Sequence, residues 1–334
     1  MKIIVPMAGM GKRMRPHTLT IPKPLIPIAG KPIVHHLMED IVKVCPEKVD
    51  EIAFVVGRSF GKTIESQLIK IAESLEAIGT IHYQDEPLGT AHAILSAEPA
   101  LTGKVVVAFA DTLFRTDANI DATSDGTIWV KQIDDPRQFG VVKVDKNNVI
   151  TEFVEKPQEF VSDLAIIGIY YFKDGKNLCS ELQYLIDNNI KDKGEYQLTN
   201  AMENMKNKGK RLVPGKVIEW LDCGNKDATV YTNKRVLEIK FPKNKIAASA
   251  SIKDTVIIPP CFIDENVQIH NSVIGPHVSI GANSIIKNSI ITNSVIQNNV
   301  LVETTCIDNS MIGSFVQYKG KPVDLSLGDY STEK

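Results

Sequence analysis

Residues 2–25 read KIIVPMAGMGKRMRPHTLTIPKPL, and this stretch decides how the first part of the chain folds. The apolar run Lys2–Val5 is typical of a short buried strand, and the loop after it contains Gly9 and Gly11. Glycines in such a loop let the backbone approach a phosphate and point its amide groups at it. Four cations follow the loop: Lys12, Arg13, Arg15 and Lys23. Together these features predict a triphosphate site at the end of the first strand.

The sequence matches neither of two other phosphate-binding motifs. A dinucleotide-binding fingerprint needs a third glycine, but that position is Met14. A P-loop needs four residues between its glycines, and the segment Gly57–Thr63 is one residue short of that spacing. The segment is better explained as a turn between a strand and a helix.

Strand-like and helix-like segments alternate up to about Leu237, which predicts an α/β fold with a mostly parallel sheet. Strands are expected over Glu51–Val56, Lys104–Ala110, Thr127–Gln132, Val141–Asp145, Val149–Glu155 and Ala165–Phe172. Helices are expected over Pro32–Val44, Thr63–Ile78, Asp174–Asn188 and Gln197–Asn207. Ligands of such sheets bind where the carboxyl ends of the strands open into loops.

Two aspartates lie at predicted strand ends. Asp111 ends the apolar run that begins near Lys104, and Asp222 follows Glu-Trp-Leu and precedes Gly224. A carboxylate beside a highly anionic substrate is favourable only with a cation between them, and Mg²⁺ suits both oxygen ligands and phosphates. The alternative is that each aspartate caps a helix. We favour metal ligation for both.

A six-residue period replaces this pattern after the segment Phe241–Lys245, which reads as a linker. The stretch 273–286, VIGPHVSIGANSII, shows the period most clearly, and Gly, Asn and Asp between the aliphatic residues accept tight corner conformations. Such a period is typical of hexapeptide repeats, in which three short strands form each turn of a triangular parallel β-helix. The expected inward ladder is Ile252, Ile258, Ile263, Ile269, Ile274, Ile280, Ile286, Ile291, Ile296, Val302, Ile307 and Ile312.

Composition limits the remaining possibilities. The 334 residues are enough for two domains, and the net charge of −2 argues against a general nucleic-acid-binding protein. Five scattered cysteines without a C-x-x-C pair indicate reduced thiols and a cytoplasmic location. No apolar run approaches the roughly 20 residues of a membrane span, so we expect no membrane partner.

Several further stretches resemble the nucleotidyl transferase family of sugar-phosphate enzymes. The loop and its P-K-P-L and G-K-P sequences match the opening signature of that family, although Lys12 stands where the family has Thr or Ser. The resemblance continues through YQDEPLGTAHAI, FADTLF, FGVVKVD, EFVEKP, IIGIYYF, GEYQLTNAM and WLDCG. It implies a catalytic domain over residues 1–240, with a Rossmann-like sheet, and a short left-handed parallel β-helix over residues 246–318. Residues 319–334 are expected to form a flexible tail.

The resemblance also implies roles for individual residues. Catalytic charge stabilisation falls to Arg13 and Lys23, and Mg²⁺ ligation to Asp111 and Asp222. Nucleotide binding falls to Ala8, Gly9, Gly11, Lys12, Gln84, Gly89 and Thr90. Binding of the sugar phosphate falls to Gly140, Glu155, Lys156, Ile166 and Gly168.

The implied activity joins a nucleoside triphosphate, dTTP or UTP, to a sugar 1-phosphate such as glucose 1-phosphate. Two alternatives stay open: a non-catalytic regulatory or assembly subunit that binds nucleotide sugars, and a bifunctional enzyme whose β-helix transfers an acyl group. About four turns make a short solenoid, so we expect the β-helix to support homo-oligomerisation instead.

We expect structural or secondary roles for several polar and aromatic residues. His35, His36 and His92 are interpreted as structural, and Trp220 fits a sugar contact or a core position equally well. Glu195 and Gln197 are secondary candidates for the sugar site.

Overall fold

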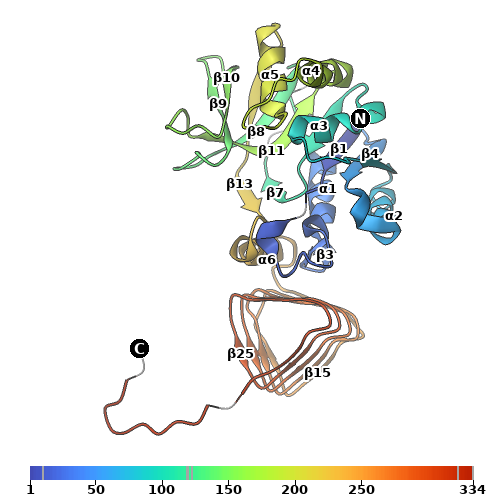
Figure 1. Ribbon diagram of the computed structural model, residues 1–334. Helices are drawn as coiled ribbons and strands as arrows, with labels where there is room; N and C mark the ends of the chain where they lie inside the picture. The colour runs from blue at the N-terminus through green and yellow to red at the C-terminus, as the bar shows by residue number, and fades with distance from the viewer. Residues whose placement is uncertain (10, 118–119, 122, 322, 333–334) are drawn as a thin grey trace. The chain divides into compact units, whose positions relative to one another are not determined.

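The computed structural model describes residues 1–9, 11–117, 120–121, 123–321 and 323–332. Its contacts divide the chain into two compact units (Figure 1). The first contains residues 1–26 and 32–224, and the second contains residues 27–31 and 225–334.

A nine-stranded sheet forms the centre of the first unit. Strands β1 (Lys2–Pro6), β4 (Glu51–Val56), β5 (Ile78–Tyr83) and β6 (Val105–Ala108) pair in parallel. The other strands are β8 (Gly126–Gln132), β9 (Gly140–Val144), β10 (Ile150–Glu155), β11 (Leu164–Phe172) and β12 (Leu212–Lys216). Strand β11 runs antiparallel to β6, β8 and β9. The α/β class is therefore confirmed, with a mixed sheet whose parallel half carries the phosphate loop.

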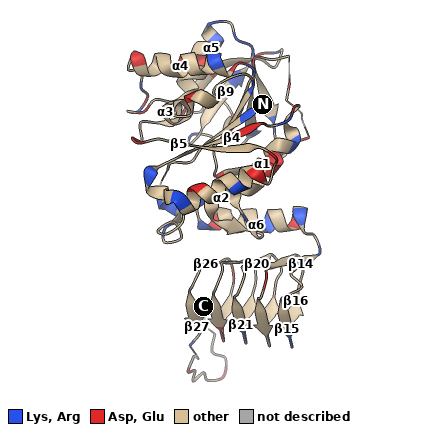
Figure 2. Ribbon diagram, turned by 90° about the vertical axis from the view of Figure 1, so that its right-hand side faces the viewer, with Lys and Arg blue, Asp and Glu red and all other residues tan. Residues whose placement is uncertain are grey.

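Helices cover both faces of this sheet, so its apolar strands are buried from two sides. In Figure 2, α3 (Thr90–Leu95), α4 (Gly175–Asp187) and α5 (Leu198–Asn207) lie on one side, and α1 (Ile33–Val44) and α2 (Gly61–Glu73) on the other. Helix α2 ends before the predicted Ile78, because Glu76 adopts a left-handed conformation with φ of 59°. Four short 3-10 turns complete the unit: η1 (Lys12–Met14), η2 (Lys23–Leu25), η3 (Arg58–Phe60) and η4 (Glu98–Ala100).

The second unit contains three parallel sheets of five, five and four short strands, which form the sides of the triangular coil in Figure 1. The first sheet contains β14 (Asn244–Ile246), β17 (Cys261–Ile263), β20 (Val278–Ile280), β23 (Val295–Ile296) and β26 (Met311–Ile312). The second contains β15 (Ser251–Lys253), β18 (Gln268–His270), β21 (Ile285–Lys287), β24 (Leu301–Glu303) and β27 (Gln317–Lys319). The third contains β16 (Val256–Ile257), β19 (Val273–Ile274), β22 (Ile290–Ile291) and β25 (Cys306–Ile307). This is the β-helix that the six-residue period predicts.

Asparagine occupies many corners of the coil, as the composition of the repeat indicates. Asn266, Asn283 and Asn299 have φ between 55° and 59°, in the left-handed region that asparagine tolerates well. Their spacing follows the coils, and the side-chain amide of Asn266 donates to Asn283 at 3.2 Å. The polar corners therefore stack in register with the apolar ladder.

One position of the predicted inward ladder is wrong. Ile258 is 40% exposed, whereas its neighbour Ile257 packs against the apolar core of the coil. Successive strand residues face opposite sides, so a register error of one residue exchanges the inner and outer position. The other predicted ladder residues belong to the core of the coil, except Ile252, Ile307 and Ile312, which are partly buried and pack against it.

Helix α6 (Lys226–Lys240) and the hairpin of β2 (Pro27–Ile28) and β3 (Lys31–Pro32) complete the second unit. Asn233 of α6 is fully buried, and its Oδ1 accepts hydrogen bonds from the backbone N–H of Ala29 and the hydroxyl of Ser279. The predicted boundary at residue 240 coincides with the end of α6, while the contacts group α6 with the strands after it. This grouping follows from the polar contacts of the helix.

The described residues after β27, which are 320–321 and 323–332, contain no helix or strand. Among the described helices, none combines the length and apolar character needed to cross a membrane.

Candidate functional site

A cavity of about 470 Å³ opens where the parallel strands of the first unit end. Its walls come from the loop after β1, the turn at η2 and the segments that follow β5 and β6. The predicted residues among its lining are Ala8, Gly9, Gly11, Lys12, Arg13, Lys23, Gln84, Gly89, Thr90 and Asp111. The predicted phosphate, nucleotide and metal residues therefore share one cavity, except for Asp222, which lies two residues before the lining residue Gly224.

Gly11 allows the phosphate loop to fold tightly against the turn that carries Lys23. Its φ is 57°, and a Cβ atom built on it would lie 2.9 Å from the Cβ of Lys23. The hydroxyl of Thr18 donates to the carbonyl of Gly11 at 2.9 Å and holds this conformation. A side chain at position 11 would displace Lys23, so glycine is required there for both backbone and packing reasons.

Lys23 and Asp111 form an ion pair across the cavity. The Lys23 Nζ lies 2.7 Å from Asp111 Oδ2, and the lysine side chain is 8% exposed against 42% for the aspartate. The aspartate directly precedes β7 (Thr112–Arg115), while the lysine begins η2. The pair thus joins the phosphate loop region to the strand-end carboxylate.

Asp222 lies beside Asp111 through strand pairing. It ends β13 (Glu219–Asp222) and pairs with Thr112, the residue after Asp111. Burial raises the pKa of Asp222, and the negative charge of Asp111 raises it further. The backbone N–H of Gly224 and the cations Lys23 and Arg13 act in the opposite direction. Asp111, Lys23 and Arg13 therefore lie close enough to Asp222 to influence it electrostatically.

The cleft has an oxygen donor set that fits magnesium. No group of three or more His, Cys, Asp or Glu side chains placed to hold a metal occurs among the described residues. Magnesium is commonly held by one or two carboxylates together with waters and substrate phosphates, so a pair of carboxylates suffices. Two neighbouring carboxylates, one with a raised pKa, provide a place where an added cation relieves repulsion.

Gln84 and Gly89 form the opposite wall of the cavity. Gln84 follows β5, and its Nε2 donates to the carbonyl of Gly89 at 3.2 Å. Gly89 has φ of 116°, and a Cβ built on it would lie 2.5 Å from the carbonyl oxygen of Tyr196. Thr90 follows and begins α3, where its hydroxyl donates to Gln197 Oε1 and accepts from the backbone N–H of Leu198. This wall is therefore rigid and rich in hydrogen-bonding groups.

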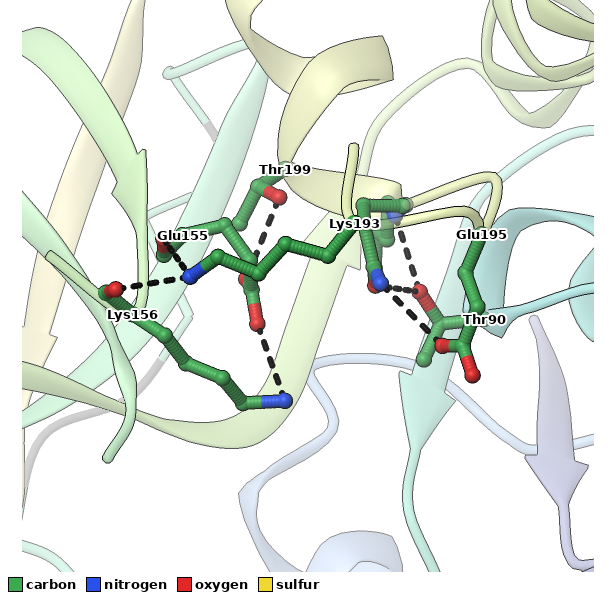
Figure 3. A network of polar contacts seen from close by, with 8 residues as sticks. Thr90, Glu155, Lys156, Lys193, Glu195 and Thr199 are labelled. Carbon is green, nitrogen blue, oxygen red and sulfur yellow. Dashed lines mark hydrogen bonds and ion pairs between the residues drawn. The ribbon is translucent and has the colours of Figure 1, made fainter. Parts of the chain in front are cut away.

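The predicted sugar-phosphate residues form a second cluster, and Figure 3 shows two of them, Glu155 and Lys156, with their polar contacts. Glu155 Oε2 accepts from the hydroxyl of Thr199 at 3.2 Å, and the Lys156 ammonium lies 3.4 Å from Glu155 Oε1. Lys193 donates to the backbone carbonyl of Lys156 at 2.8 Å. Gly140 is paired with Glu155, and a Cβ at Gly140 would meet Glu155 Oε2 at 3.1 Å. The carboxylate is therefore held by the Thr199 hydroxyl and the Lys156 ammonium.

Ile166 and Gly168 complete this cluster on β11. A Cβ at Gly140 would lie 3.2 Å from Ile166 Cδ1, which places the isoleucine beside the Gly140–Glu155 pair. The carbonyl of Gly168 accepts from the backbone N–H of Phe109, a cavity residue. Among the described residues that line the cavity, none is one of the five predicted sugar-phosphate residues.

The structure also places the residues of secondary interest. Glu195 lines the cavity, and Gln197 Nε2 donates to its carboxylate at 3.2 Å. Trp220 packs edge-to-face on Phe139 with ring centroids 4.8 Å apart. His92 lies 3.1 Å from the side chain of Gln84, a contact that the sequence analysis missed. The two residues are eight positions apart on different elements, so no local pattern signals it.

The P-loop-like segment lies elsewhere. No residue of Gly57–Thr63 is among the lining residues of the cavity, and Arg58 pairs with Asp85 at 2.6 Å. Nε2 of His277 lies 2.9 Å from the Glu238 carboxylate in the second unit.

Comparisons with known proteins agree with this arrangement. Residues 2–239 match the family model described as Nucleotidyl transferase. The chain is 31% identical over 262 residues to the protein named Bifunctional protein GlmU of Methanococcus maripaludis, covering 77% of this chain and 60% of that protein. It is 28% identical over 312 residues to glucose-1-phosphate thymidylyltransferase of Streptomyces antibioticus, covering 85% and 83%.

The fold is also similar to a solved structure. A candidate glucose-1-phosphate thymidylyltransferase from Bacillus anthracis, in complex with sucrose, aligns with a TM-score of 0.60 and 25% identity. The alignment covers 72% of this chain and 96% of that one. The chain spans about 60% of the length of the GlmU relatives that it matches.

Proposed function

From the premise that this chain belongs to the nucleotidyl transferase family, we propose that it joins a nucleoside triphosphate to a sugar 1-phosphate and releases pyrophosphate. One observation carries the proposal. A glycine loop and the cations Arg13 and Lys23 share a cavity with the strand-end carboxylate Asp111. This combination suits an anionic substrate whose charge increases during reaction.

The substrates that we propose are dTTP or UTP and glucose 1-phosphate. The backbone amides at Gly9 and Gly11, with Ala8 and Lys12 beside them, would hold the triphosphate. Gln84, Gly89 and Thr90 would hold the base, because they form the rigid polar wall opposite the phosphate loop.

The sugar 1-phosphate would bind at the cluster of Gly140, Glu155, Lys156, Ile166 and Gly168. The Glu155 carboxylate is an acceptor for sugar hydroxyl groups, and the absence of a side chain at Gly140 leaves room beside it. The Lys156 side chain is about half exposed, so its ammonium is free to turn from Glu155 to a phosphate.

Asp111 and Asp222 would hold Mg²⁺. When bound, Mg²⁺ would neutralise phosphate charge and help to align the phosphates. The ammonium of Lys23 already lies at Asp111, so this side chain would exchange its carboxylate partner for a phosphate oxygen when substrates enter.

The reaction we propose is a direct in-line displacement. A phosphate oxygen of the sugar 1-phosphate attacks the α-phosphorus, the new P–O bond forms, and the bond to pyrophosphate breaks. No covalent intermediate on the protein is required, because both substrates are held together. Arg13 and Lys23 stabilise the negative charge that builds on the phosphoryl oxygens.

A pyrophosphate-release assay tests the proposal. Four nucleoside triphosphates are combined with the 1-phosphates of glucose, glucosamine, N-acetylglucosamine and mannose, and the product is identified by mass spectrometry. We expect release with dTTP or UTP and glucose 1-phosphate. No release with any combination, in the presence of Mg²⁺, would support the alternative of a non-catalytic binding subunit.

The β-helix supplies a surface for self-assembly, and we propose that the protein is a homo-oligomer. The outward positions of one sheet form an apolar ladder of Val256, Val273, Ile290 and Cys306. Val256 is 58% exposed and Ile290 is 49% exposed. Light scattering of an Ile290→Lys variant tests the ladder, since an unchanged mass relative to the parent would count against it.

An acetyl-CoA turnover assay tests the alternative acyltransferase activity of the coil.

A further inference from the structure

The side-chain amide of Gln84 is held in one orientation by two neighbours. Its Nε2 lies 3.2 Å from the carbonyl oxygen of Gly89 and 3.1 Å from Nδ1 of His92. A carbonyl oxygen only accepts hydrogen bonds, so the amide atom that faces Gly89 must be the NH₂ group. The same carbonyl accepts from the backbone N–H of Ala93 in α3, which fixes its position.

The second hydrogen of that NH₂ group is directed at His92. Nδ1 of His92 therefore acts as the acceptor, and the proton of the neutral imidazole lies on Nε2. Gln84 lines the cavity, whereas His92 is not among the lining residues. The histidine thus stands behind the glutamine.

The remaining polar atom of the amide is then available to a ligand. Both side-chain hydrogen bonds of Gln84 use Nε2, and Oε1 has no hydrogen-bond partner among the described residues. An oxygen with free lone pairs on the cavity wall requires a donor from whatever binds beside it. Uracil and thymine carry such a donor at N3, whereas the N3 of cytosine is an acceptor.

We propose that His92 is a positioning residue that sets base selectivity, by holding the Gln84 carbonyl toward the base so that an imide N–H is accepted and cytosine is rejected. This inference rests on the proposed function, since it assumes that the cavity binds a nucleoside triphosphate. In this inference His92 shares with the Gly89 carbonyl the choice between the two orientations of the amide. The turned amide would present NH₂, the donor that suits the N3 of cytosine.

The test compares kcat/KM for UTP, dTTP and CTP in the parent and two variants. His92→Leu removes one of the two acceptors and leaves the amide held by the Gly89 carbonyl alone. We expect the ratio of kcat/KM for UTP over CTP to fall about tenfold, the effect of one correctly paired polar contact. His92→Asn places its Oδ1 one bond beyond Cγ, as Nδ1 is in histidine, so it offers a carbonyl to the same N–H and should keep most of the ratio.

A purely structural role for His92 gives a different result. It would lower kcat/KM for all three nucleotides by the same factor and leave the ratio unchanged, which would overturn the proposal. If His92→Leu fails to fold, His92→Ala replaces it, since it also removes the acceptor and should reduce the ratio. An Ala variant with the parental ratio would likewise overturn the proposal.

The parent protein separates this inference from the proposed function. A parent that releases no pyrophosphate with any triphosphate contradicts the proposed function itself. A parent that is active but prefers CTP contradicts only the orientation assigned to Gln84. A parent that prefers UTP or dTTP, with selectivity lost in His92→Leu and kept in His92→Asn, supports both.

Discussion

Replacing Lys23 with methionine tests whether its ammonium group stabilises charge at the reacting phosphate. The Lys23 side chain is 8% exposed and packs beside Gly11, so a methionine of similar length preserves the packing while removing the charge. Loss of one preorganised donor in an active site lowers turnover by about 10²–10³, or roughly 2.7–4 kcal/mol of barrier. We expect a loss of this size for Lys23→Met.

The effect of this variant on stability should be much smaller. Asp111 is 42% exposed, so water solvates its carboxylate once the ammonium is gone. After allowance for this screening, the ion pair contributes about 1 kcal/mol or less to the free energy of unfolding. Since about 1 kcal/mol shifts the melting temperature of a domain of 150–250 residues by roughly 2–4 °C, Lys23→Met should melt within a few degrees of the parent.

Steady-state pyrophosphate release at saturating substrates measures turnover, and circular dichroism measures the melting temperature. Lys43→Met is the matched control, because Lys43 also pairs with an aspartate, Asp40, but is 68% exposed on helix α1. The control should change neither quantity. Turnover of Lys23→Met within about fivefold of the parent would refute the role, because it lies far below the loss expected for a charge donor.

Three further predictions follow from other parts of the chain. Gly89→Ala should lower the unfolding free energy by about 3–5 kcal/mol, because it combines a conformation open only to glycine with a Cβ placed 2.5 Å from Tyr196 O. Gly103→Ala is the control. Its Cβ meets nothing within 4 Å, so this variant should lose only about 1–2 kcal/mol. A similar loss in the two variants, measured by urea unfolding, would contradict the packing argument. Asn233→Leu should cost about 2–5 kcal/mol in thermal unfolding, because it leaves the Ala29 N–H and the Ser279 hydroxyl unsatisfied, whereas Asn207→Leu on the exposed surface of α5 should cost almost nothing. Alkylation at pH 8 followed by peptide mass spectrometry should modify exposed Cys306 first, since burial raises the pKa of Cys45 to about 12 and of Cys261 to about 11 and leaves almost no thiolate; equal rates for the three would contradict the burial.

The sequence analysis groups the residues at the phosphate end of the candidate site, because they are close together in the chain. Gly11 and Lys23 belong to one loop and the turn after it, and the strand before them is a continuous apolar run. Asp111 is similarly marked by the strand it follows. Local composition and a strand end are enough to place these groups together.

Other features depend on contacts that leave no periodic trace. Helix α6 was missed because its buried face carries polar side chains, including the fully buried Thr229, Thr232 and Asn233. Recognition of a helix from sequence relies on apolar residues at helical spacing, and on this face Val230, Val236 and Leu237 are interrupted by the polar side chains. The contact between His92 and Gln84 was missed for a related reason, since it joins an element end to a helix by a single polar bond.

The chain passes from the first unit to the second shortly after two of the predicted site residues, Lys23 and Asp222. It leaves the first unit after Ile26, three residues beyond Lys23, and again after Gly224, two residues beyond Asp222. The segments that follow are tied together inside the second unit by the buried side chain of Asn233, which bonds Ala29 of the hairpin. No described residue of the repeat lines the cavity. Along the chain, the units are therefore joined after Ile26, Lys31 and Gly224, and loss of the hydrogen bond between Asn233 and Ala29 would untie the segments that follow the first and the last of these connections.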